Sequence, residues 1–389
     1  FVYSFAEGNK GADLYNKVQE TVDAAKKDGA TYVVALAHLG VDESSEPWRS
    51  TDFIANTTGI DAVLDGHSHS TIAMELVKNK DGKEIPLSST GTKLVNIGKL
   101  TISNGVFTTE LVSDYAAKDD TADAFVKSIQ EKNEALVNTV VARTSVDLTT
   151  KHSDGTRAIR NRETNLGDLW ADALRWFAVS GEINAAFDED DVKAGNDRIA
   201  VDADHVVALW NGGNLRADIA EGTFGAEALA EVLPFPNKVA VVYMTGAQLL
   251  ETLEAASQGL PYTAETADAC ASLMQVSGLS YTVDTAKAYD ALEAYGDHWF
   301  TAGSVSRVRI DDVNGQPFDA EATYAVVTSN ANFNGMDSSY VFKTAAEENE
   351  LSAVTVAVVR DVVWSYIASE LNNQIGDAYA APQGRLTVQ

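Results

Sequence analysis

The sequence contains one cysteine, few basic residues and no long apolar run. Cys270 alone can form neither an internal disulfide nor an all-cysteine zinc site. No stretch approaches the ~20 apolar residues of a membrane-spanning helix, so we expect no membrane span in this chain. The 29 Lys and Arg are fewer than the 57 Asp and Glu, and the formal net charge is −28. Such a polyanion repels nucleic acid, which we therefore do not expect as a partner.

The remaining composition is that of a globular protein. Of 389 residues, 45% are hydrophobic and 22% are charged, and this length predicts two or three domains. The chain opens at Phe1 without Met and without a basic leader. We expect that its natural start, including any targeting signal, is missing.

The first part of the chain has the pattern of a layered α/β domain. Apolar residues recur at helical spacing over 11–28. The apolar run 32–37 predicts a strand buried on both faces, and the run 60–64 predicts a second strand. His38 follows the first run, and Asp65-Gly-His-Ser-His69 follows the second. Ligands in such sheets bind at the carboxyl ends of the strands.

Three histidines therefore fall at the ends of two strands. His38, His67 and His69 could be ordinary loop residues, but their placement favours a site for Zn, Mn, Fe or Ni. The sequence has no serine nucleophile elbow, P-loop or Cys-His pair, so the chemistry it favours is hydrolysis by metal-activated water. Asp65 is the one adjacent carboxylate.

The rest of the chain suggests a second domain. Residues 93–114 predict two strands joined by an Asn104-Gly105 turn, and the apolar spacing predicts a helix from about 121 to 141. The charged segment 118–123 is a candidate boundary. We expect an interdomain helix over 118–141 between domains at 1–117 and 142–389, the second of them α+β.

The second domain carries a cluster of arginines. Arg157, Arg160 and Arg162 lie close together in the sequence, and Arg216 follows the glycine turn at 211–213. Guanidinium groups can grip a carboxylate or phosphate. Surface arginines can equally form weak pairs with the many acidic residues, and composition alone does not separate the two interpretations.

Two further segments could contact a ligand. Phe235 stands in a rigid Pro-Phe-Pro turn, where it could pack in the core or stack on a planar base. The Asn- and Gly-rich segment 330–337 predicts a loop. Its Asp337 could accept hydrogen bonds from ligand hydroxyls, or the loop could be capped locally.

Taken together, these motifs resemble a known family. His38-Leu-Gly40 and Gly66-His-Ser-His69 resemble the last metal motifs of the calcineurin-like metallophosphoesterases. Four later motifs resemble the C-terminal domain of the 5′-nucleotidase / UDP-sugar hydrolase family, and the order and spacing agree over nearly the whole chain. These motifs are the segments 163–167, 211–216, 233–235 and 334–337.

The resemblance implies a fold and a site. The fold is a partial metallophosphoesterase α/β sandwich followed by a 5′-nucleotidase-type α+β domain. The complete enzyme would hold two divalent metal ions, Zn, Mn or similar, with His38 and His67 as ligands of one and His69 as a ligand of the other. By the same resemblance, the substrate-binding residues are Arg160 or Arg162 with Arg216 at the phosphate or carboxylate, Asn211 in the same loop, Phe235 and Asn237 at the base, and Asp337 at the ribose.

Two departures from the family pattern matter. The family's first metal motifs are absent and would lie upstream of Phe1, so we expect no catalytic residue in this chain and little or no activity from it alone. Three histidines cannot assemble a two-metal site. Ala331 also stands where the family has a second stacking Phe, and Phe333 lies two residues further on.

The expected function is hydrolysis of nucleotide phosphate esters or pyrophosphates. The resemblance implies a bacterial protein that is extracellular, cell-surface attached or periplasmic. Its expected partners are a nucleotide or nucleoside and, as a further candidate, its own missing N-terminal fragment. Two alternatives stay open: an enzyme of the same fold that acts on non-nucleotide phosphate or sulfur esters, and a non-catalytic nucleoside-binding protein.

Overall fold

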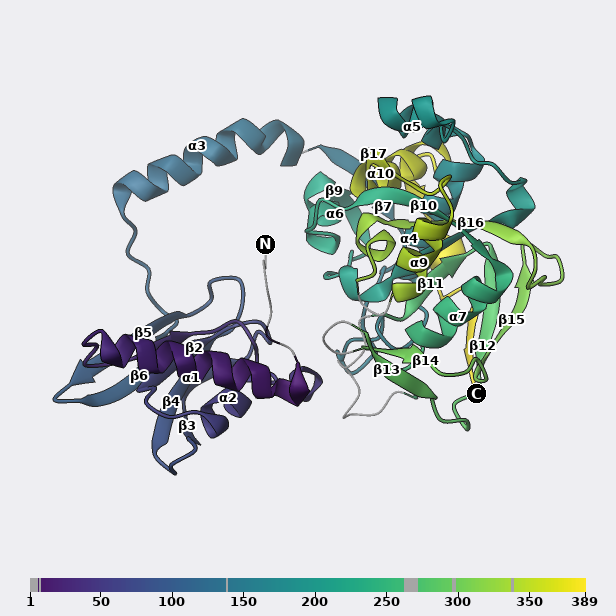
Figure 1. Ribbon diagram of the computed structural model, residues 1–389. Helices are drawn as coiled ribbons and strands as arrows, with labels where there is room; N and C mark the ends of the chain where they lie inside the picture. Colours follow the sequence, from purple (N-terminus) through teal and green to yellow (C-terminus); the bar gives the residue numbers. More distant parts are fainter. Residues whose placement is uncertain (1–5, 7, 138, 262–271, 296–298, 337–338) are drawn as a thin grey trace. The chain divides into compact units, whose positions relative to one another are not determined.

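The computed structural model describes residues 6, 8–137, 139–261, 272–295, 299–336 and 339–389 (Figure 1). The chain divides into two compact units, Phe1–Asp123 and Ala124–Gln389. The division falls inside helix α3 (Asp120–Val137). The sequence predicted that this helix continues to about 141, which is wrong, because Val140–Thr144 forms strand β7. Val140 pairs there with Gly225 of strand β9 (Gly222–Gly225), so sheet pairing overrides the helical spacing of the apolar residues.

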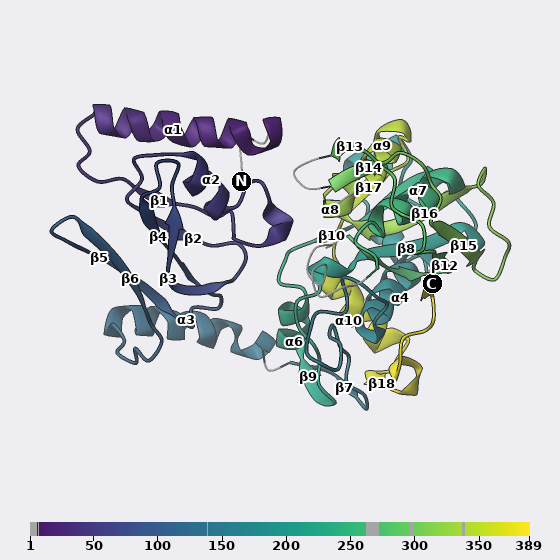
Figure 2. The same ribbon diagram turned by 90° about the horizontal axis from the view of Figure 1, so that it is seen from below.

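The first unit is built on a four-stranded sheet in the order β1-β2-β4-β3. Strands β1, β2 and β4 are parallel, and β3 is antiparallel to β4. Two helices and a hairpin complete this unit (Figure 2). Its elements are α1 (Ala12–Lys27), β1 (Val34–Leu36), α2 (Ser50–Asn56), β2 (Ala62–Asp65), β3 (Thr71–Lys78), β4 (Glu84–Thr90), β5 (Ile97–Ser103) and β6 (Val106–Val112), with 3-10 turns η1 (Asn9–Gly11) and η2 (Glu43–Ser45).

The core of the first unit joins the helices to the sheet. Val22 of α1 and Phe53 of α2 pack in one cluster with Val63 of β2 and Leu87 of β4. The helix expected over 11–28 is therefore confirmed as α1, because its apolar face is the one that packs on this cluster. The expectation that the first strand is buried on both faces is wrong. Strand β1 is the outermost strand of its sheet, and Leu36 is 82% exposed.

The hairpin of β5 and β6 confirms the predicted turn. Asn104 and Gly105 have φ angles of 51° and 78°. Positive φ at both central residues matches the right-handed twist of the paired strands, and Asn and Gly are the residues that adopt it most easily.

The second unit is built on a five-stranded mixed sheet in the order β11-β8-β16-β10-β17. The central strands are buried along nearly their whole length, which explains their continuous apolar runs. The five strands of the sheet are β8 (Val206–Asn211), β10 (Lys238–Thr245), β11 (Met274–Ser277), β16 (Thr323–Ser329) and β17 (Ala353–Val358).

Helices cover both faces of this sheet (Figure 2). Alternate residues of the strands face the two sides, as the period of two requires, so Val241 packs with α4 and α10 while Val242 packs with α7 and α9. The helices are α4 (Asn165–Val179), α5 (Glu189–Ala194), α6 (Ala226–Val232), α7 (Gly246–Ala256), α8 (Asn330–Phe333), α9 (Tyr340–Glu348) and α10 (Val359–Ser369).

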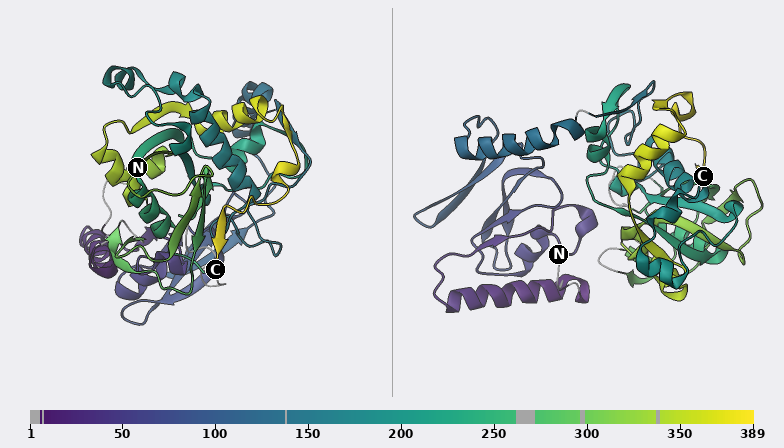
Figure 3. Two further views of the ribbon diagram at one scale, coloured as in Figure 1. Left: turned by 90° about the vertical axis from the view of Figure 1, so that its right-hand side faces the viewer. Right: turned by 90° about the horizontal axis from the view of Figure 1, so that it is seen from above.

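Smaller sheets surround this core. In Figure 3 the yellow C-terminal strand β19 (Leu386–Val388) lies beside β12 (Leu279–Val283), with which it pairs in parallel. The remaining elements are β13 (Ala291–Tyr295), β14 (Trp299–Ala302), β15 (Val308–Val313), β18 (Gln374–Ile375), η3 (Glu182–Ala186), η4 (Ala203–His205), η5 (Gly212–Asn214) and η6 (Asp377–Tyr379). None of the helices in the described ranges is long and apolar enough to cross a membrane.

Candidate functional site

In the first unit, two of the predicted histidines meet at the carboxyl edge of the sheet. Strands β1 and β2 are parallel, so His38 and His67, which follow them, emerge at the same edge. Their ring centroids lie 5.3 Å apart at an interplanar angle of 73°. A Cβ on Gly66 would lie 2.9 Å from Nδ1 of His38, so the glycine permits this close approach. Partial burial and the neighbouring His38 lower the pKa of His67, which favours the neutral imidazole that binds metals.

The loop that carries His67 has an unusual backbone. His67 and His69 have φ angles of 78° and 57°, in the left-handed region that costs non-glycine residues about 1–3 kcal/mol each. Asp65 fastens this loop to the neighbouring one, because its Oδ1 accepts hydrogen bonds from the backbone N–H groups of Leu39 and Gly40 at 3.1 and 3.3 Å. The fold thus holds a strained conformation at the strand ends.

These residues only partly fit a metal ion. The other carboxylate oxygen of Asp65, Oδ2, is buried and has no hydrogen-bond partner in the described part of the chain, as an atom facing a cation would be. However, no three His, Cys, Asp or Glu residues among those described form a group that could hold a metal. His38 and His67 therefore come together without His69 completing a ligand set. The described residues alone do not form a metal centre.

In the second unit, the arginine-rich segment forms a tightly held loop. The backbone N–H groups of Ala158 and Ile159 donate to the carbonyl of Thr150 at 2.8 and 3.0 Å. Arg160, which follows directly, is half-buried, whereas Arg162 is exposed. The loop ends at the start of α4.

A buried glutamine on the edge strand β11 organises this loop. Oε1 of Gln275, on β11, accepts a hydrogen bond from the N–H of Thr164 at 3.0 Å. Its Nε2 donates to the carbonyls of Ile159 at 3.2 Å and Arg162 at 2.9 Å. A Cβ at Gly167 would lie 2.1 Å from Oε1 of Gln275, so this position requires glycine. The glycine of the motif 163–167 thus makes room for the side chain that shapes the arginine loop.

The glycine turn lies directly against the arginine loop. A Cβ on Gly212 would stand 2.1 Å from the carbonyl oxygen of Ile159. Asn211 is fully buried, and its side chain accepts a hydrogen bond from the N–H of Gly213 at 2.8 Å, so it shapes the turn. Oδ1 of Asp218 accepts from the N–H and the hydroxyl of Thr150 at 2.7 and 2.6 Å, which fastens the two loops together.

Arg216 and Phe235 are brought together by the fold. The guanidinium carbon of Arg216 lies 5.4 Å from the ring centroid of Phe235, within the range of a cation–π contact. Phe235 is 41% exposed rather than buried, so the interpretation of this residue as core packing is wrong. An exposed aromatic ring and a guanidinium therefore stand side by side, and the guanidinium follows the glycine turn that lies against Ile159.

Asn237 lies just beyond this ring and is only 8% exposed. Its backbone carbonyl accepts from Val359, but Oδ1 of its side chain has no hydrogen-bond partner within the ranges described. A buried amide oxygen without a partner costs free energy, and a ligand donor at this point would recover it.

The predicted nucleoside loop is only partly described. Ala331, at the expected position of the second aromatic, lies in α8, and Phe333 packs against the core cluster of α7 and α9. The expectation of a loop is wrong for 330–333, which form α8, and the first residue of this helix lies near the Phe235 turn, because the N–H of Lys238 donates to Oδ1 of Asn330 at 3.0 Å. Asp337 lies outside the described residues.

A buried carboxyl pair supports the same region. Asp168 is fully buried, and burial, followed by the charge of Glu163, raises its pKa to about 8. The C-terminal segment seals this pair, because Gln383 donates its N–H to Asp168 at 3.0 Å and Leu386 donates to Glu163 at 3.0 Å. The Arg385 guanidinium lies 3.8 Å from Asp168. No local sequence signal indicates Asp168, Arg385 or Gln275 as part of this region, because their partners lie far away in the sequence.

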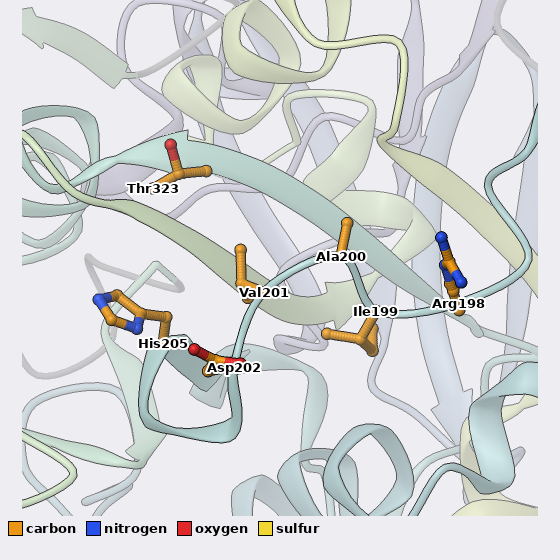
Figure 4. Close-up of a pocket in the computed structure, with 7 residues that line it drawn as sticks. All are labelled: Arg198, Ile199, Ala200, Val201, Asp202, His205 and Thr323. Atoms are coloured by element: carbon orange, nitrogen blue, oxygen red, sulfur yellow. The ribbon is translucent and has the colours of Figure 1, made fainter.

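A pocket of about 590 Å³ opens elsewhere on the second unit. It is lined by the segment from Arg198 to Asp202, by His205 and by Thr323. Asp202 and His205 lie next to each other at one end, and Arg198 lies at the other (Figure 4). Among the predicted site residues that the structure describes, none lines this pocket.

Comparisons with known proteins agree with this arrangement. The family described as "5′-nucleotidase, C-terminal domain" matches residues 140–346. The trifunctional nucleotide phosphoesterase protein YfkN of Bacillus subtilis is 26% identical over 88% of this chain. A cell wall protein of Listeria monocytogenes is 28% identical over 74% of it. The chain spans only 21% and 33% of the lengths of these two relatives.

The fold is similar to that of a solved 5′-nucleotidase precursor from Thermus thermophilus. The TM-score is 0.67 at 25% identity, and the similarity covers 96% of this chain and 67% of the other. Both units are therefore included in the match. The expected fold, with a metallophosphoesterase-type α/β part followed by a 5′-nucleotidase-type α+β domain, is confirmed.

Proposed function

Because the chain belongs to the family of the 5′-nucleotidase C-terminal domain, we propose that the protein hydrolyses nucleotide phosphate esters or pyrophosphates and that its second unit binds the nucleotide. The family match covers the arginine loop, the glycine turn and the Phe235 turn. Relatives named as nucleotide phosphoesterases support the same reaction class.

One observation carries the proposal: the contact between the guanidinium of Arg216 and the ring of Phe235. A guanidinium binds phosphate through charge-assisted hydrogen bonds, and an aromatic ring stacks on a base. Nucleotides carry both groups. We assign Arg160, Arg162 and Arg216 to the anionic part of the substrate, and Phe235 with Asn237 to the base. Asn211 shapes the turn that carries Arg216, and Asp337 stays the candidate for the ribose.

In the first unit, His38, His67 and His69 are the candidate ligands for divalent metal ions such as Zn or Mn. If bound there, a metal of this kind would supply Lewis-acid activation of water and would neutralise phosphoryl charge. The paired rings of His38 and His67 and the unpartnered oxygen of Asp65 support this assignment. We therefore assign only these three histidines as metal ligands and name no complete ligand set.

A second candidate function is hydrolysis of non-nucleotide phosphate or sulfur esters by the same fold. The packing of Phe333 against the core favours this second function, because Phe333 then does not complete a sandwich around the base with Phe235. A purely nucleoside-binding role is the third candidate. For location, the similarity to a cell wall protein supports an extracellular or surface-attached protein.

The test is a phosphate-release assay on the protein expressed from its whole gene, with Mn²⁺ or Zn²⁺ added. The substrates are 5′-AMP, a UDP-sugar and p-nitrophenyl phosphate. We expect turnover of the two nucleotides, and we expect Arg216→Ala to raise KM about tenfold or more, since a charge-assisted fork is worth roughly 1.5–3 kcal/mol. Arg309→Ala, which removes an exposed arginine paired with Asp311, is the matched control.

Each outcome selects one candidate. Turnover of p-nitrophenyl phosphate without turnover of the nucleotides contradicts the proposal and favours the second candidate. Binding of adenosine without release of phosphate from any substrate favours the third. An unchanged kcat/KM in Arg216→Ala would show that this arginine does not bind the substrate and only forms weak surface ion pairs.

A further inference from the structure

A chain of hydrogen bonds runs from the backbone to one of the candidate arginines through a histidine that the proposed function does not use. Nδ2 of Asn161 donates to the carbonyl of Arg157 at 2.8 Å. Because a carbonyl only accepts, this contact fixes which end of the amide carries nitrogen. Oδ1 of Asn161 then lies 2.9 Å from Nε2 of His152. Asn161 is only 6% exposed, so its amide is held in place.

The amide in turn fixes the tautomer of the histidine. Since Oδ1 of Asn161 can only accept, Nε2 of His152 must carry the proton. In the neutral ring, Nδ1 then has a free lone pair. Nη1 of Arg162 lies 3.3 Å from this Nδ1 and donates to it. The sequence of contacts from Arg157 to Arg162 is therefore directional, and each donor faces an acceptor.

The imidazole is not needed to close the loop on which it stands. Backbone bonds already do so, because the N–H of His152 donates to the carbonyl of Thr156 at 2.8 Å and the N–H of Gly155 donates to the carbonyl of His152 at 3.0 Å. Oδ1 of Asp154 also accepts a hydrogen bond from the N–H of Thr156 at 2.9 Å, which closes a turn. The ring is therefore available to orient the guanidinium of Arg162.

We propose that His152 is a positioning residue that holds the guanidinium of Arg162 toward an anionic ligand. The proposal rests on the function proposed above, in which Arg162 binds the substrate phosphate. Arg162 is exposed, and a long exposed side chain loses rotamer freedom when it binds. An acceptor at Nδ1 of His152 restricts that freedom in advance, so less is lost when the phosphate arrives.

The first test measures binding to the 389-residue chain by calorimetry, with 5′-AMP and inorganic phosphate as anionic probes and adenosine as the uncharged probe. We expect His152→Met to weaken binding of both anions about three- to tenfold, the size of one lost orienting hydrogen bond. Adenosine binding should not change. His152→Gln, which keeps one donor and one acceptor, should restore most of the affinity. His205→Met, the same change at another half-buried histidine of this unit, is the control.

A double-mutant cycle shows whether the effect passes through Arg162. If it does, His152→Met added to Arg162→Ala costs no further affinity for 5′-AMP. Equal losses in the presence and absence of Arg162 would overturn the proposal. A parallel loss of adenosine affinity would also overturn it, because only a general structural role would produce that result.

The second test needs no ligand. Nitrogen-15 NMR of the wild-type imidazoles should show His152 in the Nε2–H tautomer, and Arg162→Ala should shift its Nδ1 resonance. A proton on Nδ1 would refute the proposal. Failure of the proposed function has a different signature: the wild-type chain would not bind 5′-AMP while His152 still showed the Nε2–H tautomer. Binding of 5′-AMP that is insensitive to His152→Met would leave the function intact and overturn the positioning role.

Discussion

Gln275 offers the sharpest test of how the second unit holds its arginine loop. Its side chain is 1% exposed and makes three hydrogen bonds to backbone groups of Ile159, Arg162 and Thr164. The substitution Gln275→Met keeps an unbranched side chain of similar length and removes the amide. It therefore deletes the three bonds and creates little new space.

The expected loss follows from these contacts. A buried hydrogen bond contributes about 0.5–1.5 kcal/mol net, and a buried donor or acceptor left unpaired costs about 1–3 kcal/mol. Three bonds of this kind contribute about 1.5–4.5 kcal/mol, which is a large share of the roughly 5–15 kcal/mol that holds a typical domain folded. Water cannot replace Gln275 at the N–H of Thr164 or at the carbonyl of Ile159, because these residues are only 3% and 0% exposed.

The measurement is urea unfolding of the second unit, combined with hydrogen exchange at the amide of Thr164. We expect a lower free energy of unfolding, faster exchange at Thr164 and weaker binding of 5′-AMP, because the carbonyls that anchor the arginine loop lose their donor. Gln316→Met makes the same chemical change at an exposed position and should stay within about 0.5 kcal/mol of wild type. A loss below about 1 kcal/mol in Gln275→Met, with 5′-AMP binding unchanged, would refute the reasoning.

Three further predictions concern single side chains. Phe235→Leu should weaken adenosine binding about two- to tenfold, the value of one aromatic contact, as calorimetry would measure, whereas equal affinity would remove Phe235 from the base site. The pKa of Asp168 is raised from 3.8 to about 8 in the folded protein, so the stabilisation from its bound proton is complete below pH 3.8 and is lost as the pH rises to about 8. Asp168→Asn should therefore flatten the decrease in the free energy of unfolding over this range, and an unchanged slope in urea titrations at several pH values would contradict the assignment. In the protein expressed from its whole gene, His67→Ala should weaken binding of Zn²⁺ or Mn²⁺ in a metal titration, with His205→Ala as the control, and unchanged metal affinity would show that His67 is not a ligand.

Several elements could be predicted because their signals are local. The spacing of apolar residues in α1 and the Asn104-Gly105 pair act over one or two turns of chain, and the structure confirms both. The order of short motifs predicted the two-part fold and the family. The same local signals fail where another segment competes, as at Val140, which pairs in a sheet although its spacing suits a helix.

The tertiary structure decided how the candidate site is assembled. Gln275 lies 111 residues from the Thr164 that it binds, and nothing in its neighbourhood along the chain indicates that partner. The contact of Arg216 with Phe235 likewise depends on two separate segments that the fold brings together, whereas the relay from Asn161 through His152 to Arg162 lies within the single loop 152–162. Sequence patterns describe how each segment prefers to fold by itself. Which buried donor meets which acceptor is determined only when packing places distant segments together and leaves each buried polar group one partner within reach.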